Sequence, residues 1–298
     1  MNGFIAILKP PGMTSHDVVN VVRKIMGTKK VGHAGTLDPE AAGVLVVAVG
    51  KATRLLEYLQ LSNKSYRAEV TFGIATNTQD QEGEVISKQS AGNITSEDIN
   101  AVLNNFCGKG QQTPPAFSAI KYKGRPLYSL ARKGEKIKVE PREIEIYEIK
   151  LIKYYQNDIF PKAMIDLSCS KGTYVRTICH DLGENLGCGA HLSALLRTSV
   201  GSFKLENSFT LEEINALKDE KNTIFLLPLT EGLADYPEIT ITNDVKKRVL
   251  NGVPIAGEAI SPEKGYVRVQ DQDGCLLAVG EVVYENETKT IKMRKVIK

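Results

Sequence analysis

The sequence predicts an α+β protein: a mixed or antiparallel central sheet with flanking helices, followed by a small β-rich C-terminal domain. Two observations support this class. Strand-like and helix-like segments are interleaved along the chain without strict alternation of one strand and one helix. Beyond a segment at 228–237 that is bounded by prolines, short apolar runs surround a turn at 271–274, which is typical of a hairpin. We therefore place a domain boundary that gives domains 1–235 and 236–298.

The first domain contains several runs with the composition of strands. Residues 44–49 form a continuous apolar run, which indicates a buried strand, and residues 66–72 alternate between apolar and polar side chains. The expected strands of this domain are 4–8, 44–49, 66–72, 144–155 and 163–169.

Helical periods occur between these runs. Polar residues 14–17 offer N-cap candidates for an apolar helical pattern that continues to Met26. Further helices are expected at 52–61, at 96–106 with Ser96 as its cap, and at 174–186 before Gly187. The segment at about 111–142 is rich in basic and turn-forming side chains, so we expect an insertion that leaves the core.

Composition bounds the class of protein. The 298 residues are 42% hydrophobic and 24% charged, which is ordinary for a globular protein. No apolar run reaches the roughly 18 residues of a membrane span, and the N-terminus lacks a signal-type segment. The five cysteines form no C-x-x-C pair, which argues against a zinc site and a disulfide framework. We expect a cytoplasmic protein without membrane contact.

The residue spacing excludes the common motifs for binding nucleotides, redox cofactors and catalytic zinc. Gly50-Lys51 invites a phosphate-loop interpretation, but Leu45 and Ala52 stand where that loop needs Gly and Ser or Thr. No G-x-G-x-x-G opens a helix after a strand, and the four histidines lack the spacing of H-E-x-x-H. Redox-cofactor and metallohydrolase functions therefore have little support, and we predict no metal ligands.

Basic residues cluster although the net charge is only +3. Residues 121–142 contain eight basic and two acidic side chains, and residues 286–298 contain five basic and one acidic. Such clusters are expected where a protein binds a phosphate backbone. A solvated surface explains the clusters equally well.

The most informative segment is the loop at 32–45, with the sequence G-H-A-G-T-L-D-P-E-A-A-G-V-L. Its glycines let the backbone approach a ligand closely. Pro39 restricts Asp38 to extended conformations, which would hold the carboxylate in a fixed direction. The alternative is that Asp38 is an ordinary turn residue.

This loop matches the pattern G-H-x-G-T-L-D-P-x-A-x-G-x-L, which resembles the catalytic motif of the TruB family of tRNA pseudouridine synthases. Other segments are similar to the family in the same order along the chain. They are K-P-P-G-M-T-S at 9–15, K-S-Y at 64–66, G-I-A-T-N-T-Q-D-Q-E-G at 73–83, P-P-A-F-S-A-I-K at 114–121 and K-G-T-Y-V-R-T at 171–177. The matches span residues 9 to about 202. The C-terminal domain resembles a PUA domain only in length, position and β content.

The resemblance implies the pseudouridine synthase fold, with 111–142 as an RNA-clasping insertion. It implies Asp38 as the catalytic residue, Arg176 as its partner cation and Tyr66 as an active-site aromatic. It also implies substrate-binding roles for His33, Lys9, Tyr174, Leu195 and Asp80, and RNA contacts for Lys121, Lys123 and Arg125. Structural alternatives stay open: Tyr66 as a core aromatic, His33 as a structural histidine, Lys9 as a loop support or a solvated lysine, and Asp80 as an Asx-turn residue.

The implied reaction breaks the N1–C1′ bond of uridine and rejoins the base through C5. The product is an isomer, so the stoichiometry requires no redox cofactor, ATP or metal. A carboxylate can add to the base or the sugar, or stabilise positive charge that develops at C1′. The carboxylate must be ionised to do so, and a nearby cation is therefore expected. The base must also be flipped out of its stack, and an aromatic platform can offset the cost of unstacking.

The resemblance implies that the substrate is the uridine at position 55 in the T-arm stem-loop of tRNA. Two other functions stay open: a non-catalytic RNA-binding or RNA-folding module, and a guide-RNA-dependent synthase subunit. The joint presence of Asp38, Tyr66 and Arg176 disfavours the first, and the lack of long tails disfavours the second. We expect a stand-alone monomer with no cofactor and no obligate protein partner, which could also assist tRNA folding.

Overall fold

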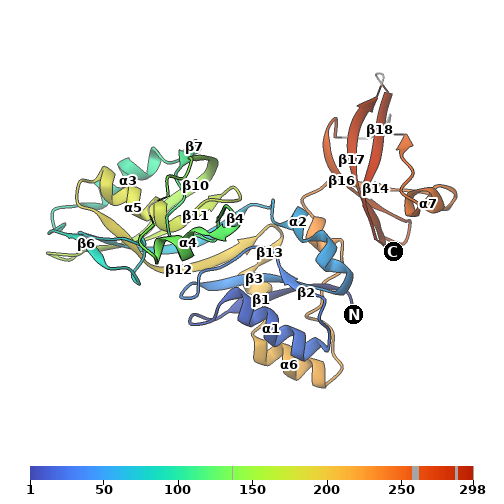
Figure 1. Ribbon diagram of the computed structural model, residues 1–298, viewed down its shortest axis with the longest axis horizontal. Helices are drawn as coiled ribbons and strands as arrows, with labels where there is room; N and C mark the ends of the chain where they lie inside the picture. Colours follow the sequence, from blue (N-terminus) through green and yellow to red (C-terminus); the bar gives the residue numbers. More distant parts are fainter. Residues whose placement is uncertain (136, 257–261, 286–287, 298) are drawn as a thin grey trace.

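The computed structural model of the chain describes residues 1–135, 137–256, 262–285 and 288–297. Within these residues the main feature is a nine-stranded sheet (Figure 1). Its order is β1 (Gly3–Lys9), β3 (Ala42–Val49), β12 (Ala190–Val200), β4 (Lys64–Phe72), β11 (Lys162–Cys169), β10 (Arg142–Tyr155) and β7 (Gly108–Gln112), while β2 (Val31–His33) pairs with β3 and β13 (Phe203–Lys204) pairs with β12. The pairing of β3 with β12 is parallel and the other pairings in this sheet are antiparallel, so the predicted mixed sheet is confirmed.

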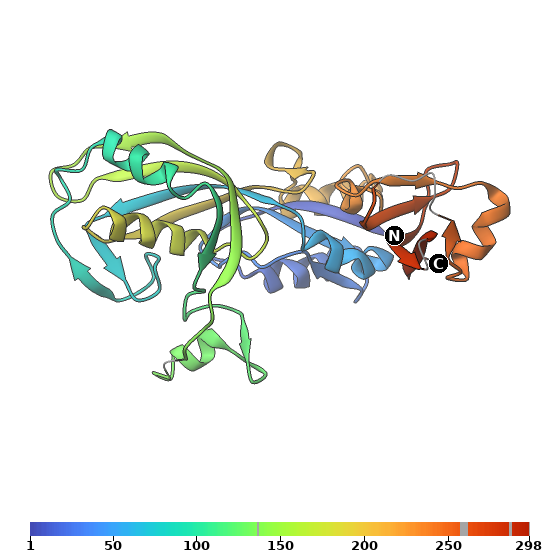
Figure 2. The same cartoon turned by 90° about the horizontal axis from the view of Figure 1, so that it is seen from above.

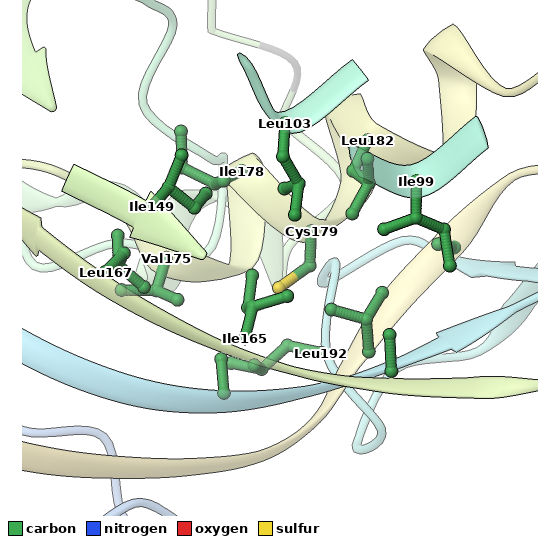
Figure 3. Close-up of a cluster of buried hydrophobic side chains, with 14 of the residues drawn as sticks. Ile99, Leu103, Ile149, Ile165, Leu167, Val175, Ile178, Cys179, Leu182 and Leu192 are labelled. Atoms are coloured by element: carbon green, nitrogen blue, oxygen red, sulfur yellow. The ribbon is translucent and has the colours of Figure 1, made fainter. Parts of the chain in front are cut away.

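Helices pack against both halves of this sheet. In Figure 1, α1 (Ser15–Met26) and α6 (Leu211–Asp219) lie side by side next to β1 and β3. On the other half, α3 (Ser96–Asn104) and α5 (Val175–Asn185) pack over β10, β11 and β4. Figure 3 shows side chains of this core: Ile99, Leu103, Ile149, Ile165, Ile178, Cys179 and Leu182. Full burial of one aliphatic side chain contributes about 1.5–3 kcal/mol, so this core fixes the position of α5 and of Arg176 in its first turn.

Local hydrogen bonds explain where the helices begin. The Thr14 hydroxyl accepts a hydrogen bond from the Asp17 amide, and the Asp17 carboxylate accepts one from the Thr14 amide, which forms a capping box for α1. Thr95 caps α3 in the same way, so the prediction of Ser96 as the cap is wrong by one residue. The predicted helix at 52–61 is a 3₁₀ turn, η1 (Gly50–Leu55), followed by α2 (Leu56–Leu59).

Strand β12 is not among the predicted strands, although it lies at the centre of the sheet between β3 and β4. Its register against β4 shifts at Leu192/Ala194 and again at Arg197/Ser199. Each shift inserts an irregularity that breaks the two-residue alternation of side chains. A periodic signal for this strand is therefore missing from the sequence. The predicted loop 32–45 is shorter in the structure, because β2 occupies its beginning and β3 starts at Ala42.

The insertion leaves the sheet between β7 and β10. It carries a short hairpin of β8 (Lys121–Tyr122) and β9 (Arg125–Pro126), followed by α4 (Leu127–Ala131). Figure 2 shows it as a green lobe that projects away from the sheet. Residue 136 of the predicted insertion lies outside the described residues. A second hairpin, of β5 (Ile74–Thr76) and β6 (Val85–Lys88), follows β4.

The chain after residue 237 forms the predicted β-rich C-terminal domain. Its five-stranded sheet has the order β14 (Glu238–Thr240), β16 (Gly265–Gln270), β17 (Leu276–Glu285), β18 (Thr288–Val296) and β15 (Ile255–Ala256). The expected hairpin is the β16–β17 pair, and 245–250 lies in a helix, α7 (Asn243–Leu250). Residues 257–261, 286, 287 and 298 of the predicted domain and its basic tail lie outside the described residues. The boundary at 235/236 stays a prediction.

Aromatic side chains join the C-terminal domain to the main sheet. Tyr58 of α2, Tyr236 and Tyr266 of β16 pack edge to face, and the Tyr58 and Tyr266 ring centroids are 5.1 Å apart. The Tyr236 hydroxyl donates to the Tyr58 carbonyl at 3.0 Å. The remaining short elements, η2 (Leu205–Asn207) and η3 (Glu231–Leu233), lie on the chain that leads to this joint. None of the described helices is long and apolar enough to cross a membrane.

Candidate active site

Asp38 lies on the loop that connects β2 with β3. Its side chain is 47% exposed, so the carboxylate is open to a ligand. The Asp38 carbonyl accepts from the Ala41 amide at 3.1 Å, and the next carbonyl, of Pro39, accepts from the Gly12 amide at 3.0 Å. The backbone on the C-terminal side of the carboxylate is therefore fixed by hydrogen bonds.

Buried polar side chains hold the backbone of this loop by hydrogen bonds. The Ser15 hydroxyl binds both the amide (2.9 Å) and the carbonyl (3.0 Å) of Leu37. Lys9 is fully buried, and its ammonium donates to the carbonyls of Pro39 (2.8 Å), Pro10 (2.8 Å) and Met13 (2.6 Å). Burial lowers the pKa of Lys9 to about 8. All three N–H donors of Lys9 are used inside the protein, so this geometry favours loop support over a phosphate contact or a solvated lysine.

Arg176 connects Asp38 to two other segments. Its Nη2 lies 3.6 Å from Asp38 Oδ2 and donates to the Phe117 carbonyl at 2.8 Å, and its Nη1 donates to Asp80 Oδ2 at 3.0 Å. The Arg176 side chain is only 8% exposed, so solvent screens these interactions little. The structure thus brings together the expected carboxylate and its expected partner cation. Phe117 lies near the start of the insertion, so the same guanidinium also contacts the base of that segment.

Asp80 combines the two roles weighed for it. Its Oδ1 accepts from the Glu82 amide at 3.2 Å, which is an Asx turn, and from the Thr78 hydroxyl at 2.6 Å. Its Oδ2 is the oxygen that binds Arg176. The turn therefore directs the Asp80 carboxylate toward the arginine.

Tyr66 lies on β4, where it faces Arg197 of β12 as its direct cross-strand neighbour. Only 8% of the residue is exposed, and it packs within the core of α3 and α5. Burial raises the pKa of its hydroxyl above the ordinary value, while the positive charge of Arg197 acts in the opposite direction. The ring offers little surface for a stacked base in this structure, so proton transfer fits its placement better than stacking.

The other expected pocket residues surround this centre. The Tyr174 ring lies 5.9 Å from the Arg176 guanidinium carbon, and Gln112 binds the Tyr174 backbone amide at 2.8 Å and its carbonyl at 3.0 Å. Leu195 is half-buried on β12, opposite Ala68 of β4.

His33 ends β2, and its Nδ1 accepts from the Gly35 amide at 3.3 Å. Burial lowers the pKa of His33, which favours the neutral imidazole. A neutral ring with Nδ1 as acceptor braces the first turn of the catalytic loop, which supports the structural alternative for this residue.

Lys121, Lys123 and Arg125 lie apart from this centre, on the exposed β8–β9 hairpin of the insertion. Arg125 is 4.0 Å from Glu135, and the Lys123 ammonium lies 5.5 Å from the Tyr122 ring centroid. The described part of the chain holds no group of three or more His, Cys, Asp or Glu side chains arranged to hold a metal ion.

Two buried cations near the loop are not among the expected site residues. Arg197 donates to the carbonyls of Val44 (2.7 Å), Gly35 (3.2 Å) and Thr36 (3.3 Å). Lys64 donates to the carbonyls of Ser62 (2.7 Å) and Gln60 (3.2 Å), and burial lowers its pKa to about 8. A basic residue next to an apolar run is the one sequence signal for Arg197, and the bulges of β12 remove the alternation that would mark its strand.

Known proteins provide an independent comparison. The model of the TruB family pseudouridylate synthase N-terminal domain matches residues 23–175, and that of the tRNA pseudouridylate synthase B C-terminal domain matches residues 176–234. The chain is 45% identical to a protein named tRNA pseudouridine synthase B from Moorella thermoacetica, over 99% of both chains. It is 50% identical to the protein of the same name from Symbiobacterium thermophilum, over 85% of this chain and 83% of the relative.

A solved structure shares the fold as well. A chain in the crystal structure of a Cbf5-Nop10-Gar1 complex superposes with a TM-score of 0.77 and 27% identity, over 99% of this chain and 85% of the other. Family models, relatives and fold therefore all indicate the same family. This chain belongs to the TruB family of pseudouridylate synthases.

Proposed function

We propose that this protein converts the uridine at position 55 of the tRNA T-arm loop into pseudouridine, without a guide RNA or a protein partner. The observation that carries the proposal is the half-exposed Asp38 carboxylate, which a hydrogen-bonded loop presents beside Arg176. The names of the two relatives at 45% and 50% identity support tRNA as the substrate.

The bond changes define what the site must do. The N1–C1′ bond breaks, the C5–C1′ bond forms, the proton on C5 leaves, and N1 gains a proton. Asp38 is the group that adds to the base or sugar or stabilises charge at C1′. Arg176 lies 3.6 Å away and favours the ionised form that these roles need. Tyr66 fits the transfer of the C5 proton, because it lies directly opposite Arg197 on the neighbouring strand and its hydroxyl can both donate and accept a proton.

RNA binding is assigned to two surfaces. The exposed Lys121, Lys123 and Arg125 project on the insertion lobe, whose root at Phe117 contacts Arg176. RNA loops are recognised by shape and by splayed bases, and a projecting basic lobe beside an active site suits that mode. The C-terminal domain, which we regard as PUA-like, supplies further phosphate contacts. Residues 1–235 form the catalytic domain in this proposal, and the protein acts as a cytoplasmic monomer that also assists tRNA folding.

One assay separates this function from the two alternatives. Purified protein is incubated with an unmodified tRNA transcript, and pseudouridine is mapped. We expect product at position 55 without guide RNA, no product with Asp38→Asn, and near wild-type product with Glu40→Gln. Glu40 is a matched control because it is an exposed carboxylate on the same loop. Product that depends on a guide RNA would favour the guide-dependent alternative, and binding without product would favour the non-catalytic one.

A further inference from the structure

Arg197 lies where three strands of the central sheet meet. On β12 it is the direct neighbour of Tyr66 on β4 and of Gly43 on β3. Gly43 has a φ of +111°, and a Cβ there would lie 2.2 Å from the Arg197 carbonyl oxygen. Only glycine therefore lets β3 approach β12 this closely, and the backbone from which the Arg197 side chain extends is held in place on both sides.

The guanidinium of Arg197 binds the catalytic loop at both ends. Nη1 and Nη2 donate to the carbonyls of Thr36 and Gly35, just before Asp38, and Nε donates to the carbonyl of Val44, after it. Tyr66 is the direct cross-strand neighbour of Arg197, and the positive charge of Arg197 lowers the pKa of the Tyr66 hydroxyl against the larger effect of burial. One planar group thus binds the Asp38 loop from a position directly beside Tyr66 in the sheet.

The burial of this cation has a free-energy cost that a simple brace would avoid. Only 2% of Arg197 is exposed, and no carboxylate of the described residues forms an ion pair with it. Burying a cation without a counter-charge costs several kcal/mol, which carbonyl hydrogen bonds offset only in part. A guanidinium offers five N–H donors in one plane, so it reaches carbonyls on both sides of Asp38 from its place beside Tyr66, which a side chain with one or two donors could not do.

We propose that Arg197 is a positioning residue that holds the Tyr66 hydroxyl and the Asp38 loop in one rigid frame, so that both groups reach the same nucleotide. This proposal rests on the proposed function. Arg197 acts through Tyr66 and the loop, and does not touch the substrate. Its charge also opposes the effects of burial, of Cys169 and of Asp38, each of which raises the pKa of Tyr66.

The kinetic test combines Arg197→Lys with Tyr66→Phe. Lysine keeps the charge and loses the fork. We expect Arg197→Lys to lower kcat on the order of 10- to 100-fold while tRNA affinity stays within about twofold. In the Tyr66→Phe background the same substitution should lower kcat by a smaller factor, because part of its effect passes through the hydroxyl. If Arg197→Lys lowers kcat by the same factor in the wild type and in Tyr66→Phe, the proposal is overturned.

Arg67→Lys is the matched control, because Arg67 follows Tyr66 on β4 and pairs with Asp166 in solvent. We expect it to leave kcat and melting temperature near wild type. If Arg197→Lys fails to fold while Arg67→Lys folds, Arg197 is a structural residue only, and the proposal is overturned.

A second readout requires no enzymatic activity. The ultraviolet absorbance of tyrosinate is titrated, and subtracting the curve of Tyr66→Phe isolates Tyr66. We expect Tyr66 to ionise at higher pH in Arg197→Lys, and at still higher pH in Arg197→Met, than in the wild type. Unchanged titration in both variants would refute the contact. If the wild type makes no pseudouridine in tRNA, the proposed function fails, while this titration still decides whether Arg197 acts on Tyr66.

Discussion

Replacing Arg176 with Lys keeps the positive charge beside Asp38 and removes the fork that the structure uses. Arg176 reaches three oxygens on three segments: Asp80 at 3.0 Å, the Phe117 carbonyl at 2.8 Å and Asp38 at 3.6 Å. The shorter lysine side chain ends in a single nitrogen, which cannot span oxygens on opposite sides of a planar guanidinium. At least one of the two short hydrogen bonds must therefore break.

The expected fall in kcat for Arg176→Lys follows from the burial of the Arg176 side chain. The Arg176 side chain is 8% exposed, so the broken interaction is one of the stronger, charge-assisted kind. Such a hydrogen bond contributes about 1.5–3 kcal/mol. If its removal acts fully on the transition state, kcat falls about 10- to 150-fold, since 1.36 kcal/mol corresponds to a factor of ten.

The assay is single-turnover tritium release from tRNA labelled at uridine C5, at saturating enzyme. Arg67→Lys is the control, because Arg67 lies outside the insertion and pairs with Asp166 at the exposed surface. We expect the control to keep its rate and melting temperature, and Arg176→Lys to lose several degrees of melting temperature while it stays folded at the assay temperature. A rate for Arg176→Lys within about twofold of wild type would refute the reasoning that the forked geometry, beyond the charge, is needed.

Three further outcomes are expected from the same structure. Replacing Lys121, Lys123 and Arg125 with Ala should weaken tRNA binding and flatten its salt dependence by roughly 0.7–0.9 in log–log slope for each phosphate that is no longer neutralised; an unchanged slope would mean that the hairpin is only a solvated surface. The pKa of the buried Lys64 is lowered to about 8, from 10.5 in the unfolded chain. Below pH 8 the buried charge therefore lowers the free energy of unfolding, and this destabilisation decreases as pH rises toward 10.5 because Lys64 loses its proton in the folded state first. The free energy of unfolding of the wild type, minus that of Lys64→Met, should therefore increase between pH 8 and 10.5 in denaturant titrations, and a flat difference would contradict the burial argument. An isolated T stem-loop should be modified, whereas one with its tertiary loop pair disrupted should react poorly; equal rates would show that local sequence is read instead of loop shape.

Features that depend on neighbours along the chain could be predicted from the sequence. The capping box that begins α1 joins residues three apart, and the apolar run of β3 is buried throughout. The loop that carries Asp38 also follows from a short contiguous segment, because Gly and Pro constrain the backbone wherever they stand. The identity of the candidate carboxylate likewise needed no tertiary information, because the resemblance that points to it rests on contiguous segments.

The missing parts of the site depend on residues that are far apart in the chain. The Arg197 guanidinium binds the carbonyl of Val44, 153 positions away, and Lys9 binds the carbonyl of Pro39, 30 positions away. Backbone carbonyls are present at every residue, so no side-chain pattern marks which of them will receive a buried cation. The bulges of β12 add to this, because they remove the alternation that would have revealed the strand on which Arg197 lies. Only the folded sheet brings β3, β12 and β4 side by side, and the geometry that holds Asp38 and Tyr66 together arises there.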